Sequence, residues 1–182
     1  MVPMIIGITG KAGAGKGVVV DYLVQQKGFK HFSARGFIVE EIEKRGLSVD
    51  RENMIAVAND LRAKHSPSYI IESLYAQALE RGGDAVIESI RTPGEVEALK
   101  GAQDFCLFAI DAPVDMRYER IKARRSETDF VTFEKFKAED DLESFSTDPT
   151  KQNVSVCITM ADFVFKNFGT VEELYEKVDK VL

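Results

Sequence analysis

Two kinds of hydrophobic pattern alternate along the chain. Short runs of consecutive apolar residues are separated by longer segments in which apolar residues recur every three or four positions. A short continuous run is typical of a strand buried on both faces, and the wider spacing is typical of an amphipathic helix. The runs predict five strands, at Met4–Ile8, Phe29–Phe32, Asp84–Glu88, Phe105–Ile110 and Phe163–Phe165.

Helices are predicted between these strands, and several have recognisable ends. Asp50 can cap one helix, Ser66-Pro67 begins another, and Thr92 and Thr170 each stand three residues before a glutamate, as in a capping box. The other helices are expected at Val18–Gln26, Phe37–Arg45, Pro113–Arg124 and Phe133–Phe145. This alternation predicts a three-layer α/β fold, a five-stranded parallel sheet with helices on both faces. No linker or repeat divides residues 1–182, so a single domain is expected.

The first predicted turn has the spacing G-x-x-x-x-G-K between a buried strand and a helix. Glycines there let backbone N–H groups surround a phosphate, and the following helix points its positive dipole end at the same anion. Lys16 adds a charge that can reach the β- and γ-phosphates. The sequence thus predicts a P-loop that binds a nucleoside triphosphate through Gly10, Lys11, Ala12, Gly13, Ala14, Gly15, Lys16, Gly17 and Val18. Since Gly17 and Val18 lack a hydroxyl, Mg²⁺ is expected to be held by phosphates, water and a carboxylate from elsewhere.

Charge and composition limit the classes of molecule that this protein is expected to bind. The net charge is −6, whereas surfaces that neutralise nucleic acid need an excess of clustered lysine and arginine, so no nucleic-acid partner is expected. No apolar stretch approaches the roughly 18 residues of a membrane span, and the N-terminus lacks the pattern of a signal peptide. Cys106 and Cys157 lie singly in apolar surroundings and are expected to be reduced core residues. We therefore expect a cytoplasmic protein, either a monomer or a homodimer, whose partners are small-molecule nucleotides.

The loop and the residues that follow two strands resemble the adenylate kinase-type branch of P-loop kinases. That branch carries G-x-x-G-x-G-K-G, which makes Gly17 expected, although Val18 stands where those enzymes have threonine. The segment Ile87–Thr92 resembles one in which an acidic residue and an arginine face the substrate phosphates. Asp111-Ala112-Pro113 with the arginines after it resembles a stretch where one arginine packs on the donor base and others clamp phosphates. The resemblance implies these roles for Arg120, Arg124 and Arg125.

Nearly the whole chain resembles a mainly archaeal family of adenylate kinase-like and dephospho-coenzyme A kinase-like proteins. The shared segments are Arg51–Arg62, Ile90–Val96, Asp111–Arg124 and Ala161–Gly169. The resemblance implies a helical acceptor-binding part at about residues 33–81 and a short helical lid at about residues 125–149. A lid of this kind closes over the donor and excludes water.

Candidate site residues follow from the chemistry of phosphoryl transfer, which depends on positioning and on cations around the developing charge. Lys16, Arg91 and Arg124 are the candidate catalytic residues, and Arg120 is expected near the donor base. Candidates for substrate binding are Ser33, Arg51, Arg62, Glu88 and Arg91, and Glu88 is also the candidate for Mg²⁺.

Several of these residues can also be interpreted without any role in binding or catalysis. Arg120, Arg124 and Arg125 can also form a solvated basic helix end, and Glu88 can be an ordinary surface carboxylate. Asp111 is interpreted as a helix cap, and His31 and His65 as structural or exposed residues.

These features favour an enzyme that uses ATP and Mg²⁺ to phosphorylate a nucleoside or deoxynucleoside monophosphate. Transfer to a hydroxyl usually needs a carboxylate base, and the Asp-x-Asp of dephospho-coenzyme A kinase is absent. A kinase of a small metabolite such as dephospho-coenzyme A is therefore the second hypothesis. The third hypothesis is a non-catalytic nucleotide-binding regulatory module. In the resembling kinases, threonine stands at the position of Val18 and arginine at that of Val39, and catalysis would use both.

Overall fold

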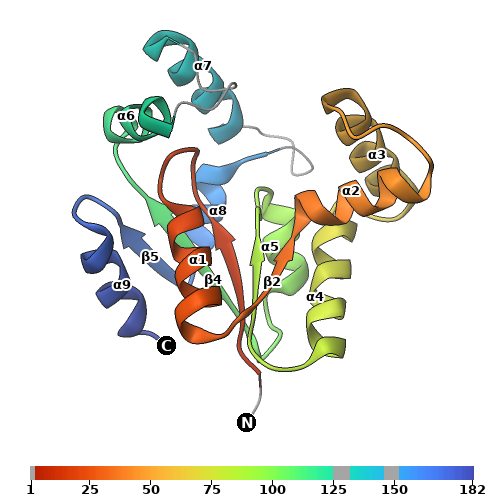
Figure 1. The fold of residues 1–182 in the computed structure, drawn as a ribbon, viewed down its shortest axis with the longest axis horizontal. Helices are drawn as coiled ribbons and strands as arrows, with labels where there is room; N and C mark the ends of the chain where they lie inside the picture. Colours follow the sequence, from red (N-terminus) through yellow and green to blue (C-terminus); the bar gives the residue numbers. More distant parts are fainter. Residues whose placement is uncertain (1–2, 125–131, 146–151) are drawn as a thin grey trace.

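A computed structural model describes residues 3–124, 132–145 and 152–182 (Figure 1). Its sheet has five parallel strands in the order β2-β3-β1-β4-β5. Their bounds are β1 Ile5–Thr9, β2 Lys30–Ser33, β3 Ala85–Glu88, β4 Phe105–Asp111 and β5 Phe163–Lys166. The predicted fold class is thus confirmed, and all five predicted strands are present.

Helices pack on both faces of this sheet (Figure 1). They are α1 Lys16–Lys27, α2 Ala34–Lys44, α3 Arg51–Lys64, α4 Tyr69–Arg81, α5 Pro93–Leu99, α6 Val114–Arg124, α7 Phe133–Ser144, α8 Val154–Met160 and α9 Val171–Asp179. Successive residues of a strand point to opposite faces. In β1, Ile5 therefore packs toward α4, α5 and α8, whereas Ile6 and Ile8 pack toward α1 and α9. This alternation gives the domain two hydrophobic cores, one on each side of the sheet.

Several predicted helix ends are confirmed. Asp50 accepts a hydrogen bond from Asn53 N at the start of α3, and Thr92 and Thr170 form reciprocal capping boxes with Glu95 and Glu173. Two details were wrong. The helix expected from Ser66-Pro67 begins later, at Tyr69. Asp111 does not cap α6, since it is the last residue of β4, and its carboxylate accepts a hydrogen bond from Lys166 Nζ at 2.6 Å.

The short helix α8 has no counterpart among the predicted elements. Its sequence, VSVCITM, is rich in β-branched residues, which favour strands over helices. Asn153 caps it by accepting from Val156 N, and Val154 and Cys157 are buried between α5 and the sheet. Tertiary packing therefore overrides local propensity here. Both cysteines are free, with Cys157 buried and Cys106 half-buried.

Because the strands are parallel, their carboxyl ends share one rim of the sheet. The P-loop follows β1 at that rim, and α6 and α7 lie above it (Figure 1). Of the predicted lid, α7 forms a helix as expected, but residues 125–131 and 146–149 lie outside the described residues. No helix among the described residues is long and apolar enough to cross a membrane.

Candidate nucleotide-binding site

The P-loop joins β1 to α1 in a conformation that its glycines make accessible. Gly13 and Gly15 have φ angles of 77° and 107°, in the left-handed region that other residues rarely adopt. A Cβ atom on Gly13 would also meet the carbonyl of Arg117, and one on Gly15 would meet the amide of Asn167. The loop therefore requires glycine for its backbone shape and for the close approach of its neighbours.

Lys16 lies at the start of α1 and reaches back across the loop. Its Nζ donates to the carbonyl oxygens of Gly10 at 2.7 Å and Lys11 at 2.9 Å. These acceptors are neutral, so an anion that enters the loop would offer this ammonium group a stronger partner. The N–H groups of the first turn of α1 point toward the same space.

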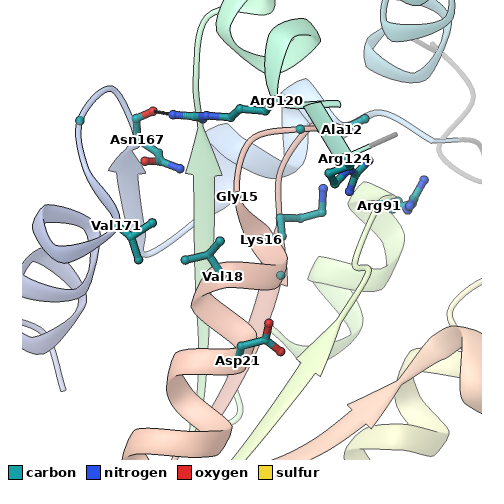
Figure 2. Close-up of a pocket in the computed structure, with 13 residues that line it drawn as sticks. Ala12, Gly15, Lys16, Val18, Asp21, Arg91, Arg120, Arg124, Asn167 and Val171 are labelled. Carbon is teal, nitrogen blue, oxygen red and sulfur yellow. Dashed lines mark hydrogen bonds between the residues drawn. The ribbon is translucent and has the colours of Figure 1, made fainter. Parts of the chain in front are cut away.

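A pocket of about 700 Å³ opens beside the loop (Figure 2). Its lining residues are Ala12, Gly13, Gly15, Lys16, Gly17, Val18, Asp21, Arg91, Arg120, Arg124, Asn167, Gly169 and Val171. Four of these carry positive charge, whereas Asp21 is the single carboxylate in this set. The balance of charge suits a polyanionic ligand.

Arg120 and Asn167 close one end of this pocket. Arg120 Nη2 donates to the backbone carbonyl of Asn167 at 2.8 Å, while Asn167 Nδ2 donates to the carbonyl of Ala14 at 2.8 Å. Asn167 is buried and follows β5, so it ties the end of that strand to the P-loop. Together with the neighbouring Gly169 and Val171, these residues form a wall against which a flat ring can pack.

Arg91 enters the pocket from the segment after β3. Its backbone N–H donates to Glu95 Oε2 at 2.9 Å, and its carbonyl accepts from Asn153 N at 3.0 Å. Burial raises the pKa of the Glu95 carboxyl, an effect that the N–H groups of Arg91 and Thr92 and the charge of Arg62 partly oppose. Arg62, which carries that charge, lies in the last turn of α3.

Ser33 and Glu88 lie side by side at the carboxyl ends of β2 and β3. Ser33 Oγ donates to Glu88 Oε1 at 2.8 Å and accepts from Gly36 N, which caps α2. His31 Nε2 lies 3.5 Å from Glu88 Oε2. Glu88 is not among the residues that line the 700 Å³ pocket. No group of three or more acidic, histidine or cysteine side chains forms a cation site among the residues the structure describes.

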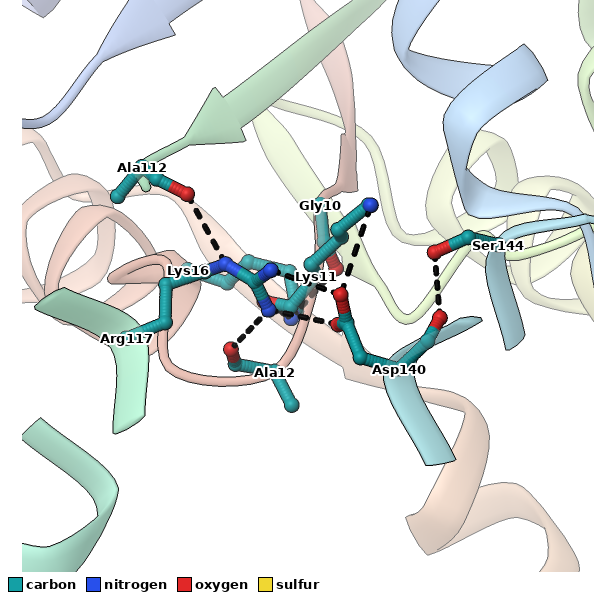
Figure 3. Close-up of polar contacts among 8 residues, drawn as sticks. All are labelled: Gly10, Lys11, Ala12, Lys16, Ala112, Arg117, Asp140 and Ser144. Atoms are coloured by element: carbon teal, nitrogen blue, oxygen red, sulfur yellow. Dashed lines mark hydrogen bonds and ion pairs between the residues drawn. The ribbon is translucent and has the colours of Figure 1, made fainter. Parts of the chain in front are cut away.

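On the other side of the P-loop, an ion pair joins α6 to α7 (Figure 3). Arg117 Nη1 and Nη2 donate to the two oxygens of Asp140 at 2.6 and 2.8 Å, and Nη1 also donates to the carbonyl of Ala12. Lys11 Nζ lies 3.6 Å from Asp140. Burial alone would raise the pKa of the Asp140 carboxyl, but the hydrogen bonds and charge of Arg117, with help from Lys11, hold it below its ordinary value.

A family model described as an AAA domain matches residues 6–140, about three quarters of the chain. The chain is also 31% identical over 185 residues to a UPF0200 protein of Thermococcus gammatolerans, with 98% of this chain and 93% of the relative covered. This chain is a member of the UPF0200 family. A UPF0200/UPF0201 protein of Archaeoglobus fulgidus is 33% identical over 148 residues, and that match covers 79% of this chain but only 44% of the longer relative.

Solved structures place the UPF0200 chain among P-loop kinase folds. Shikimate kinase from Bacteroides thetaiotaomicron superposes with a TM-score of 0.60 at 11% identity, and the match covers 98% of this chain and 97% of that one. At this identity the likeness shows the fold alone. The predicted relation to P-loop kinases is thus confirmed at the level of the fold.

The structure brings most of the predicted cations together. Lys16, Arg91, Arg120 and Arg124 all line the pocket, as do Ala12, Gly13, Gly15, Gly17 and Val18 from the loop. Gly10, Lys11 and Ala14 belong to the same loop but do not line the pocket. The Lys11 side chain instead lies against Asp140.

Two predicted arginines cannot be placed in the site. The side chain of Arg51 lies outside the described residues, although its backbone begins α3. Arg125 also lies outside them. His31 contacts Glu88, His65 stacks on Tyr69, and both histidines are exposed, which fits the prediction of structural or exposed residues.

Three residues around the loop were not predicted from the sequence, namely Asn167, Arg117 and Asp140. Asn167 follows a buried strand, so the rule that ligands bind at the carboxyl ends of parallel strands offered a signal for it. Arg117 and Asp140 are 23 residues apart, and in the sequence each resembles the exposed charges around it. Only the packing of α6 against α7 reveals that they form a pair.

Proposed function

We propose that this protein is an ATP-dependent phosphotransferase that moves the γ-phosphate to a nucleoside or deoxynucleoside monophosphate. The observation that carries this proposal is the pocket beside the P-loop, in which Lys16, Arg91, Arg120 and Arg124 meet. Phosphoryl transfer requires in-line positioning and positive charge around the transferred group, and it asks little other chemistry of the protein.

Each cation has a distinct place in this proposal. The loop N–H groups and Lys16 hold the β- and γ-phosphates, while Arg91 and Arg124 face the transferred group from β3 and α6. Arg120, with Asn167, Gly169 and Val171, receives the base and ribose at the other end of the pocket. The donor then spans the pocket with its phosphates on the loop.

ATP would act with Mg²⁺, which would neutralise part of the charge on its phosphates. Gly17 and Val18 provide no hydroxyl for the ion, and open space surrounds the position of a Cβ on Gly17. Glu88, whose Oε1 accepts from Ser33 Oγ, is the carboxylate at the carboxyl end of β3 that would hold the ion through water. A single carboxylate suits Mg²⁺, since the ion usually retains several waters.

The acceptor is assigned to the edge of the sheet that carries the ends of β2 and β3, with α2 following β2 and α3 packed on α2. Ser33, Arg62 and Glu88 lie on this side, and Arg91 stands between it and the P-loop. An acceptor phosphate needs arginines but no base, which favours a monophosphate. The cations on this side are those that such a group requires.

A second candidate is a kinase that phosphorylates a hydroxyl of a small metabolite, such as dephospho-coenzyme A. Glu88 favours this candidate, because it accepts from Ser33 and lies 3.5 Å from His31, so it is a carboxylate held in place near the acceptor side. A positioned carboxylate can take the proton of an attacking hydroxyl. The kinase fold shared with shikimate kinase is compatible with both acceptors.

A panel of acceptors separates these functions. The protein is incubated with ATP, Mg²⁺ and each nucleoside or deoxynucleoside monophosphate, or with dephospho-coenzyme A, and ADP formation is followed. Turnover with a monophosphate supports the first function, and turnover with dephospho-coenzyme A alone supports the second. ATP binding without turnover on any acceptor contradicts both and favours the regulatory module. A preparation of Lys16→Ala measures the background of contaminating enzymes.

A further inference from the structure

The segment after β3 has an uncommon backbone that points Arg91 into the pocket. Ser89 has a φ angle of 73° and is the only residue other than glycine with positive φ in the described part of the chain. Such a conformation is unfavourable for a residue with a side chain, because its Cβ crowds the backbone. Ile90, which is buried, then donates its N–H to the carbonyl of Ile8. The chain therefore turns sharply between a buried anchor and the pocket.

Glu95 holds the next two residues of this segment. Its Oε2 accepts from Arg91 N at 2.9 Å and from Thr92 N at 3.1 Å, while Glu95 N donates to Thr92 Oγ1. Only 3% of Glu95 is exposed. Carboxylates are seldom this deeply buried, because removing them from water is costly.

A capping box by itself does not require such burial, as the second box of this chain demonstrates. Glu173 makes the same reciprocal bonds with Thr170, but its side chain is exposed. The helix that Glu95 caps, Pro93–Leu99, is short, so its own stability would be served by a solvent-facing glutamate. The burial of Glu95 and its additional bond to Arg91 therefore serve the segment before the helix.

Arg91 is also held from the opposite side. Its carbonyl accepts from Asn153 N at 3.0 Å, just before α8, and its guanidinium Nη1 lies 3.4 Å from Gln152 Oε1. The backbone of Arg91 is thus fixed at both its N–H and its C=O. With those two groups fixed, the guanidinium lines the pocket together with Lys16 and Arg124 (Figure 2).

We propose that Glu95 is a positioning residue, which fixes the backbone of Arg91 so that its guanidinium meets the phosphates at the P-loop. This inference rests on the function proposed above and names a residue that acts on the reaction only through Arg91. A cation displaced by about 1 Å loses much of its effect on a transferring phosphoryl group. Loss of Glu95 therefore lowers kcat, whereas the donor, which is held mainly by the P-loop, keeps its KM.

A double-mutant cycle with Arg91 tests this role. Glu95→Ala is expected to lower kcat by about 10–100-fold with a change of less than about threefold in the KM for ATP. In an Arg91→Ala background, the same Glu95→Ala change is expected to add less than about twofold, since the residue through which it acts is gone. Glu95→Gln keeps an oxygen acceptor for both N–H groups and is expected to retain activity near that of the wild type. Additive effects of the two alanine variants would overturn the proposal.

Glu173→Ala is the matched control, since it removes the glutamate of the other capping box. Its effect is expected to be the same in the wild-type and Arg91→Ala backgrounds, whatever its size. Thermal unfolding of every variant verifies that the kinetic effects belong to folded protein.

Amide NMR signals of Arg91 and Thr92 test the anchor without turnover. Their exchange with solvent is expected to be slow in the wild type and in Glu95→Gln, and faster in Glu95→Ala. Unchanged amide exchange at Arg91 and Thr92 in Glu95→Ala would overturn the proposal that Glu95 fixes this backbone. Absence of wild-type turnover with every acceptor, together with protected amides, would instead count against the proposed function.

Discussion

The two flanks of the P-loop carry similar charges but are built in opposite ways. On one flank, Lys16 donates to neutral carbonyls and faces a pocket of about 700 Å³ lined by three arginines. On the other flank, Lys11 and Arg117 meet the carboxylate of Asp140 (Figure 3). Four cations that line one pocket suit an anionic ligand, whereas two cations against one buried carboxylate indicate a structural support.

The supporting flank is also connected to the loop itself. Arg117 is 2% exposed and donates to the carbonyls of Ala112 and Ala12 in addition to Asp140. Two parallel N–H···O bonds and two carbonyl acceptors satisfy most of the guanidinium, which offsets the cost of burying it. The pair therefore links α7 to the outer side of the P-loop and helps to fix the shape of the loop.

The largest expected effect is the difference between the two lysines of the loop. Lys16→Ala should lower kcat/KM by at least about a thousandfold and strongly weaken ATP binding, because it removes the charge on the β- and γ-phosphates. Lys11→Ala should lower kcat/KM by less than about tenfold, since its ammonium group lies against Asp140. Steady-state ADP formation measures kcat/KM of the two variants, and calorimetric titration measures their ATP binding. Equal losses in the two variants would contradict the functional difference between the flanks.

The second effect concerns stability. Asp140→Ala should lower the free energy of unfolding by about 3–5 kcal/mol, because it leaves the buried Arg117 charge without its partner. The neighbouring Asp141 is exposed, and Asp141→Ala should change stability by less than about 0.5 kcal/mol. Urea unfolding followed by circular dichroism compares the two. A small loss of unfolding free energy in Asp140→Ala would contradict a structural role for the Arg117–Asp140 ion pair.

The smallest expected effect is a pH dependence of this same flank. The pKa of the Asp140 carboxyl is held below its ordinary value, mainly by Arg117 acting against the effect of burial. Its contribution to stability is therefore complete above the unfolded-state pKa of about 3.9 and is lost as the pH falls through the lower folded-state pKa. Between pH 6 and 3, wild-type protein should lose more stability than Asp140→Asn, in urea unfolding at each pH. Parallel pH profiles would exclude Asp140 as the titrating group.

Prediction from the sequence succeeded where a pattern is local. The P-loop, both capping boxes and all five strands depend on residues within a few positions of one another, and the structure confirms them. Prediction did not extend to α8, whose β-branched residues become helical only when packed between α5 and the sheet. The prediction that Asp111 caps the next helix was wrong, because its carboxylate accepts a hydrogen bond from Lys166 across the strand pair β4–β5.

The sequence alone predicts that this chain folds as a P-loop protein and which lysine and arginines are candidates to contact phosphates. Those conclusions follow from spacing and residue type, because the loop needs its glycines and Lys16 at fixed positions along the chain. Which cations line the pocket and which lie against Asp140 follows from the folded structure instead. Arg117 and Arg120 lie three residues apart on one helix, yet one is buried against Asp140 and the other lines the pocket. The partner of a charge comes from a distant part of the chain, and folding alone brings the two together.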